Sequence, residues 1–85
     1  MKTYSGDRTI DGVIVLVNQA HLLPDTSGAI FSDTGFEWGY DGPGPRQLAY
    51  TILIDHLGDT SRAKALVPRF VEGCVARLDN EWSIS

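Results

Sequence analysis

The sequence predicts an α+β fold in which a small antiparallel sheet, in β-β-β-α-α-β order, packs against two helices. Three observations predict this class. Residues 13–17 form a β-branched apolar run, residues 36–40 alternate aromatic residues with others, and two stretches after residue 44 carry apolar residues at helical spacing. The length of 85 residues and the hydrophobic content of 42% predict a single globular domain, 1–85.

Two strands are expected near the N-terminus. Residues 2–8 contain β-formers, and Asp11-Gly12 is a turn dipeptide that predicts a hairpin. Val13–Val17 has no polar alternation, which predicts a central strand covered on both faces. Residues 18–34 then form a long connection, in which residues 21–24 are either a short turn or an edge segment.

A third strand is expected over residues 36–40, where Phe36, Trp38 and Tyr40 alternate with other residues. The Gly-Pro-Gly-Pro stretch at 42–45 ends it, because a proline cannot donate a backbone hydrogen bond.

A helix is predicted over residues 45–57, with Pro45 at its first position and Gly58 just beyond its end. Its apolar residues cover an arc of roughly 240° at 100° per residue. We therefore expect the sheet to cover one side and another helix to cover a second. Gln47, Thr51 and Asp55 fill the remaining arc.

The residues Asp59-Thr60-Ser61 are a helix N-cap signal, and apolar residues follow at helical spacing. Pro68 either kinks one helix or begins a new one. We favour a short turn at 60–66 and a longer helix at 68–79. Residues 81–85 alternate apolar and polar residues, which predicts a closing strand.

The cysteine content and hydropathy predict a cytoplasmic protein. A single cysteine, Cys74, excludes an intrachain disulfide and favours a reducing compartment. No apolar run approaches the length of a membrane span, and the N-terminus has no hydrophobic segment typical of a signal peptide.

Charge is unevenly distributed along the chain. Residues 9–61 hold seven acidic residues and one base, Arg46, which disfavours direct nucleic-acid binding and favours a basic partner. A solvated acidic face is the plainer interpretation. The bases of the second helical stretch either form a solvated face or contact a phosphate backbone; they are Arg62, Lys64, Arg69 and Arg77.

No constellation predicts an enzyme, a cofactor or a metal site. Cys74 lies on an apolar helical stripe and is expected in the core, and His21 and His56 are too few and scattered for zinc. His56 is expected to be partly buried in the last turn of its helix. The glycines before residue 45 suit a turn better than an anion site.

Two further groups each have two interpretations. Carboxylates at Glu37, Asp41, Asp55 and Asp59 are either a solvated surface or a pair for acid–base work or a divalent ion. Aromatic rings at Trp38, Tyr40 and Trp82 are either core or a stacking platform.

The stretch F-x-W-G-Y-x-G-x-G-P-x-x-L-A-x-x-I-L, from Phe36 to Leu53, resembles a family of small domains of unknown function found in bacteria, phages and plasmids. Tyr4-x-Gly6-x-Arg8 and the later Gly58-Asp59 and Val75-Ala76 extend the resemblance over most of the chain. The phage and plasmid setting implies a host-takeover or anti-defence protein, such as an anti-CRISPR inhibitor, by analogy.

We therefore expect a small acidic non-enzymatic protein, monomeric or weakly dimeric, that inhibits a larger host nucleic-acid-binding complex by occupying its basic DNA-reading surface. The expected partner-binding residues are acidic: Asp25, Asp33, Glu37, Asp41, Asp55 and Asp59. The alternative is a module that binds a small ligand or peptide at the Trp38–Gly42 turn.

Overall fold

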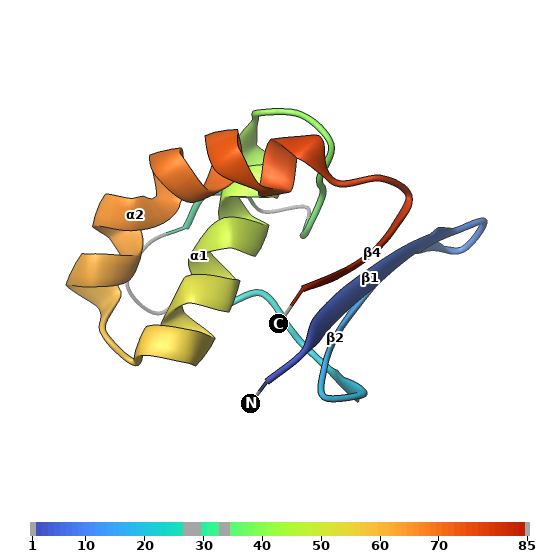
Figure 1. Cartoon of the computed structure of the whole chain (residues 1–85), viewed down its shortest axis with the longest axis horizontal. Coiled ribbons are helices and arrows are strands. Elements are labelled where there is room, and N and C mark those ends of the chain that lie inside the picture. The colour runs from blue at the N-terminus through green and yellow to red at the C-terminus, as the bar shows by residue number, and fades with distance from the viewer. Residues whose placement is uncertain (1, 27–29, 33–34, 85) are drawn as a thin grey trace.

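The computed structural model describes residues 2–26, 30–32 and 35–84, and arranges them as a layer of strands beside a layer of helices (Figure 1). This arrangement confirms the predicted α+β class. The elements are β1 (Tyr4–Thr9), β2 (Gly12–Val17), β3 (Ala20–His21), α1 (Pro43–Leu57), α2 (Thr60–Gly73), the 3-10 turn η1 (Val75–Arg77) and β4 (Glu81–Ile84).

The four strands form an antiparallel sheet in the order β3-β2-β1-β4. The predicted hairpin is confirmed, since β1 and β2 pair from Tyr4 opposite Val17 to Thr9 opposite Gly12. The Thr9 hydroxyl supports the turn: it donates to the carbonyl of Gly12 at 2.8 Å and accepts from the N–H of Asp11 at 3.2 Å. The predicted closing strand is β4, which pairs with β1.

The prediction that residues 13–17 are covered on both faces is wrong. Val15 is buried, but its neighbour Ile14 is 39% exposed. Side chains alternate across a strand, so Val15 faces the helices while Ile14 faces away from them. The helices cover one face of the sheet, so an apolar run was mistaken here for a strand buried on both sides (Figure 1).

The predicted strand at 36–40 is also wrong, and the third strand is instead the two-residue β3. Phe36 and Trp38 are buried as the alternation predicts, while Tyr40 is 51% exposed. The backbone here makes isolated bonds instead of a ladder: Gly39 N–H donates to the Val75 carbonyl at 2.9 Å, and the Trp38 carbonyl accepts from Arg8 at 3.2 Å. Burial of alternate aromatic side chains therefore does not require a neighbouring strand.

Helix α1 begins two residues earlier than predicted, at Pro43, and ends at Leu57 as predicted. Gly58 follows in the left-handed conformation, with φ of 69°, and its N–H donates to the Ile54 carbonyl at 2.8 Å. The predicted C-terminal glycine is thus confirmed. His56, expected to be partly buried, is exposed.

Gln47 and Thr51 were expected outside the apolar arc of α1, yet both are buried. The Gln47 side-chain oxygen accepts from the N–H groups of Phe31 and Ser32, at 3.0 and 3.2 Å, and its amide donates to the Asp25 carbonyl at 2.8 Å. Thr51 accepts from the N–H of Asp25 at 3.0 Å. These polar side chains are buried because they bind the backbone of the long connection.

Helix α2 is one continuous helix with Pro68 inside it, so the favoured division into two helical pieces is wrong and a single helix is present. Its predicted N-cap is confirmed, since the Asp59 carboxylate accepts from the N–H of Arg62 at 3.2 Å. Pro68 and Lys64 are both exposed, so the carbonyl that loses its donor faces solvent. Cys74 follows the helix, half-buried, and burial raises the pKa of its thiol.

The two layers meet at two tryptophans. Trp38 and Trp82 are buried and pack edge to face, with ring centroids 5.5 Å apart and an interplanar angle of 82°. These two rings are core, whereas Tyr40 is not. The core also takes Leu48, Ala49 and Tyr50 from α1 and Val67 and Val71 from α2.

Candidate binding site at the 37–40 turn

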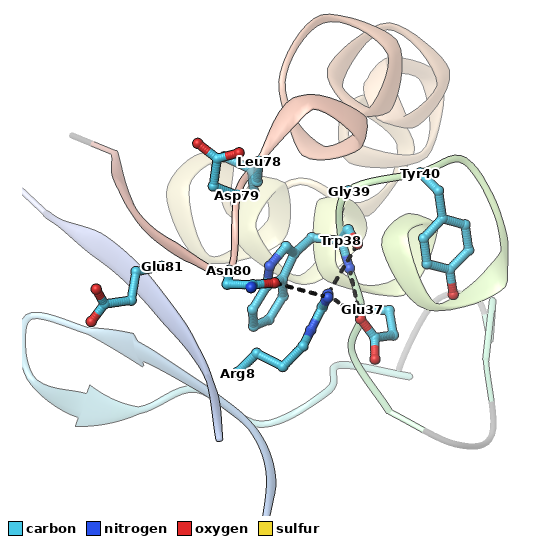
Figure 2. Close-up of a pocket in the computed structure, with 9 residues that line it drawn as sticks. All are labelled: Arg8, Glu37, Trp38, Gly39, Tyr40, Leu78, Asp79, Asn80 and Glu81. Atoms are coloured by element: carbon cyan, nitrogen blue, oxygen red, sulfur yellow. Dashed lines mark hydrogen bonds and ion pairs between the residues drawn. The ribbon is translucent and has the colours of Figure 1, made fainter. Parts of the chain in front are cut away.

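A hollow of about 750 Å³ opens where the turn at residues 37–40 meets the segment at 78–81 (Figure 2). The bond from Gly39 N–H to the Val75 carbonyl ties the turn to η1, and the pairing of β4 with β1 holds the other wall. Segments far apart in the sequence thus form one site. Its lining comprises Arg8, Glu37, Trp38, Gly39, Tyr40, Leu78, Asp79, Asn80 and Glu81.

Arg8 reaches from β1 into this hollow and makes three hydrogen bonds there (Figure 2). Its guanidinium donates to Glu37 Oε1 at 2.6 Å, to the Trp38 carbonyl at 3.2 Å and to Asn80 Oδ1 at 3.3 Å. It also lies 5.0 Å from the centre of the Trp38 ring, within cation–π range. Arg8 therefore cross-links the two walls, and three of its five N–H donors are used in doing so.

The remaining charges of the lining are negative. Glu37, Asp79 and Glu81 give the lining three acidic residues against the single Arg8, and Figure 2 shows the carboxylates of Asp79 and Glu81 pointing away from that arginine. Asp79 and Glu81 are exposed, and neither makes an ion pair within the described ranges. A hollow with this balance favours a cationic guest over an anionic one.

The aromatic residues of the lining differ in accessibility. Tyr40 is half-exposed on the turn, whereas Trp38 is 1% exposed and supports Arg8 from below. The indole N–H of Trp38 has no hydrogen-bond partner among the described residues. Tyr40 is thus the ring that a guest can reach.

The predicted acidic residues that the structure describes do not gather in one place. Glu37 lines the hollow, and Asp41, which follows the turn, forms an ion pair with Arg46 at 3.0 Å. Asp55 lies near the other end of α1 and pairs with Lys2 at 3.0 Å, and Asp59 caps α2. Asp41 and Asp55 lie near opposite ends of α1, whose 15 residues span about 22 Å at 1.5 Å per residue.

The remaining two predicted acidic residues are Asp25 and Asp33. Asp25 lies in the long connection, where its backbone binds Gln47 and Thr51. Asp33 lies outside the described residues.

Asp55 is held in its ionised form by its neighbours. Partial burial opposes ionisation, but hydrogen bonds from Tyr4 Oη at 2.7 Å and Lys2 Nζ at 3.0 Å outweigh it and lower the pKa of Asp55. The pKa of Tyr4 is raised, chiefly by burial of its hydroxyl and secondly by the hydrogen bond to Asp55. This group joins the N-terminal strand to the end of α1, which is a structural role.

Sequence reasoning missed five residues of the site: Arg8, Leu78, Asp79, Asn80 and Glu81. A usable signal existed for Arg8, which is the only lysine or arginine between residues 3 and 45. The segment at 79–81 gave only a helix stop and a strand start, and neither signal indicates a lining role.

Other classes of site find little support in the described part of the chain. No cluster of three or more metal-ligating side chains occurs there. Neither described helix has the length and apolar character needed to cross a bilayer.

Comparison with protein families gave one match. The model of a family of unknown function, DUF6166, matches residues 4–85. No curated protein and no solved structure matches the chain.

Proposed function

This chain belongs to the family of unknown function DUF6166, and we propose that it is a small non-enzymatic binding protein that holds a basic side chain of a partner polypeptide in the hollow at the 37–40 turn. The observation that carries the proposal is the charge of that hollow: three acidic residues line it, and its single cation is already bound by the protein itself.

A lysine or arginine side chain fits this chemistry. Its charge is complementary to Asp79 and Glu81, which make no ion pair within the described ranges. The half-exposed ring of Tyr40 offers a face over which a cation can lie. A hollow that is wide and open suits a side chain presented by a large partner.

The lining supports binding in preference to catalysis. It contains no histidine, cysteine, serine or threonine, so it offers no hydroxyl or thiol nucleophile activated by a histidine base. Its one arginine already donates to Glu37, Trp38 and Asn80, and the charge of Glu37 offsets its own, which weakens any stabilisation of a developing negative charge.

For the biological setting, we propose that the partner is a larger host nucleic-acid-binding complex, which the protein inhibits in the cytoplasm as a monomer or weak homodimer, in the manner of an anti-CRISPR protein. Two features support this candidate: the acidic composition between residues 9 and 61, and the further carboxylates of Asp79 and Glu81 beside Glu37. A basic DNA-reading groove presents the side chains that such a site takes.

The hollow can be tested with a ten-residue lysine peptide by titration calorimetry. We expect the double variant Asp79→Asn/Glu81→Gln to weaken binding about tenfold, which corresponds to about 1.4 kcal/mol. The control Asp11→Asn/Glu72→Gln removes the same charge at exposed positions outside the hollow and should change binding less than about twofold. Equal losses in the two variants, or no binding by the unchanged protein, would reject the proposal.

The inhibitor candidate has its own test. Tagged protein is expressed in a bacterium with an active CRISPR system, and co-purifying proteins are identified at low and moderate salt. We expect a nucleic-acid-binding complex that is retained by the control variant and lost from the Asp79→Asn/Glu81→Gln variant. Recovery of no such complex at either salt concentration would exclude this setting while leaving the peptide result unaffected.

A further inference from the structure

We propose that the partner segment binds as an extended strand added to the free edge of β4, with a basic side chain at its end nearest the hollow. The inference rests on the proposed function, because it specifies the form in which the basic partner reaches the site. It identifies the partner as a basic segment in β conformation.

The hydrogen-bond pattern of β1 shows which groups of β4 face the edge. Arg8 N–H donates to the Asn80 carbonyl at 3.1 Å, so Arg8 and Asn80 are a hydrogen-bonded pair. Such pairs alternate along an antiparallel ladder. Trp82 and Ile84 therefore direct their backbone groups at β1, and Glu81 and Ser83 direct theirs away from it.

Within the described ranges, no further strand pairs with this edge. β4 is at the end of the strand order, and β1 is the element with which it makes extensive backbone contact. Glu81 and Ser83 are exposed. Natural edge strands are commonly protected by lysine, proline or short length; β4 contains no lysine or proline, and it has four residues with Glu81 as its one charged side chain.

The edge leads directly into the hollow. Asp79, Asn80 and Glu81 line the hollow, and Glu81 is the first residue of β4 (Figure 2). A strand that pairs with Glu81 and Ser83 and continues past Glu81 therefore runs toward Glu37 and Tyr40. One segment can therefore hydrogen-bond to the free edge of β4 through its backbone and place a basic side chain in the hollow.

The charges beside the edge favour a basic segment. Asp7 lies opposite Glu81 in the pairing of β1 with β4. By the alternation described above, this is a non-hydrogen-bonded pair, in which side chains are closer, and like charges placed so are destabilising. A lysine or arginine opposite Glu81 on an added strand offsets this repulsion. A second copy of this chain, with net charge −4, brings more carboxylates instead.

Amide hydrogen exchange by NMR tests the inference on the ¹⁵N-labelled full chain, with and without the ten-residue lysine peptide. In the free protein we expect fast exchange at Glu81 and Ser83 and slow exchange at Trp82 and Ile84, which serve as internal controls. Saturation with the peptide should slow exchange at Glu81 and Ser83 at least about tenfold. Ser83→Pro, which removes one outward N–H, should weaken peptide binding, whereas Ser83→Ala should not.

The outcomes separate the two proposals. Shifts at Trp38 and Tyr40 without protection at Glu81 and Ser83 overturn strand addition and leave the basic-guest site standing. Absence of any peptide binding rejects the proposed function and this inference with it. Protection of Glu81 and Ser83 in the free protein that grows with protein concentration identifies a second copy at the edge, and this also overturns the inference.

Discussion

At the scale of single residues, Asp55 shows how a side chain from a predicted surface takes a structural role. Lys2 Nζ donates both to its carboxylate and to its backbone carbonyl, each at 3.0 Å, and the Tyr4 hydroxyl donates to the same carboxylate oxygen. The first residues of the chain are thereby fixed to the last turn of α1. A carboxylate with these donors is more acidic than a free one.

We expect Asp55→Asn to destabilise the protein by about 1 kcal/mol at pH 7, a small value because Lys2 is partly exposed and screened. The folded-state pKa of Asp55 is lowered, so its contribution is fully present above the ordinary carboxyl pKa of about 3.9 and is lost as pH falls through the folded pKa. Thermal unfolding followed by circular dichroism from pH 7 to pH 2 should show the difference from the unchanged protein closing below about pH 4.

The control for this measurement is Asp11→Asn, because Asp11 is exposed and makes no ion pair within the described ranges. Its stability difference should stay small at every pH. A constant difference for Asp55→Asn across the titration would show that its ionisation is not coupled to folding.

At the scale of elements, α2 continues through a residue that ordinarily stops a helix. Pro68 lacks the N–H that would bond to the Lys64 carbonyl four residues earlier. Since both positions are exposed, water can reach that carbonyl. The buried side of the helix, formed by Ala63, Val67 and Val71, maintains its direction across the break.

Pro68→Ala should therefore stabilise the protein by about 1–2 kcal/mol, because it restores the missing bond, partly offset by the greater freedom of the unfolded chain. Urea denaturation measures the gain. Arg69→Ala, at the adjacent exposed position, retains its backbone N–H and should change stability by less than about 0.5 kcal/mol. If Pro68→Ala gave no gain, the cost of the proline would already be relieved by other interactions in the native helix.

At the scale of the whole molecule, the sheet and the helices are joined where Trp82 crosses Gly6. A Cβ atom on Gly6 would lie 2.5 Å from the Trp82 indole. The indole ring from β4 therefore packs directly against the backbone of β1 at Gly6. Trp82 then meets Trp38, which also supports Arg8. The layer contact and the wall of the hollow thus share one aromatic pair.

Gly6→Ala should displace Trp82, lower stability by about 1–3 kcal/mol and alter the near-ultraviolet circular dichroism of the tryptophans. Gly73→Ala is the matched control. A Cβ there meets no atom within 4 Å, and alanine favours the helical end, so stability should be equal or higher. An unchanged tryptophan signal in Gly6→Ala would mean that the contact relaxes without moving the ring.

Local signals in the sequence were sufficient for much of this architecture. The hairpin at Asp11-Gly12, the cap at Asp59 and the glycine at 58 depend on neighbouring residues only, and all are confirmed. Burial was harder to predict because it depends on distant partners. Trp38 is buried by packing on Trp82 without a strand, and Gln47 is buried because it binds a remote backbone segment.

For the candidate site too, the sequence predicted the residues that are neighbours along the chain and missed those that come from distant segments. Trp38 and Tyr40 belong to the turn predicted from the sequence as the alternative binding place, and Glu37 belongs to its predicted acidic surface. Arg8 and Glu81 arrive from β1 and β4, the strands nearest the two ends of the chain, and only their pairing brings them to that turn. The spacing of residues along the sequence does not show which distant strands will pair, so the place of these two residues beside the turn could not be predicted.

Gln47 holds the long connection at residues 18–34 through the connection's main chain and not through its side chains. A primary amide carries the same donor and acceptor as a peptide bond, so this side chain stands in for a neighbouring strand and binds Asp25, Phe31 and Ser32 through their main chain. Recognition of the main chain does not depend on side-chain identity or on the number of residues between the bonded positions. Substitution of the side chains of Asp25, Phe31 or Ser32 should therefore leave these backbone bonds intact, whereas replacing Gln47 by leucine removes all three.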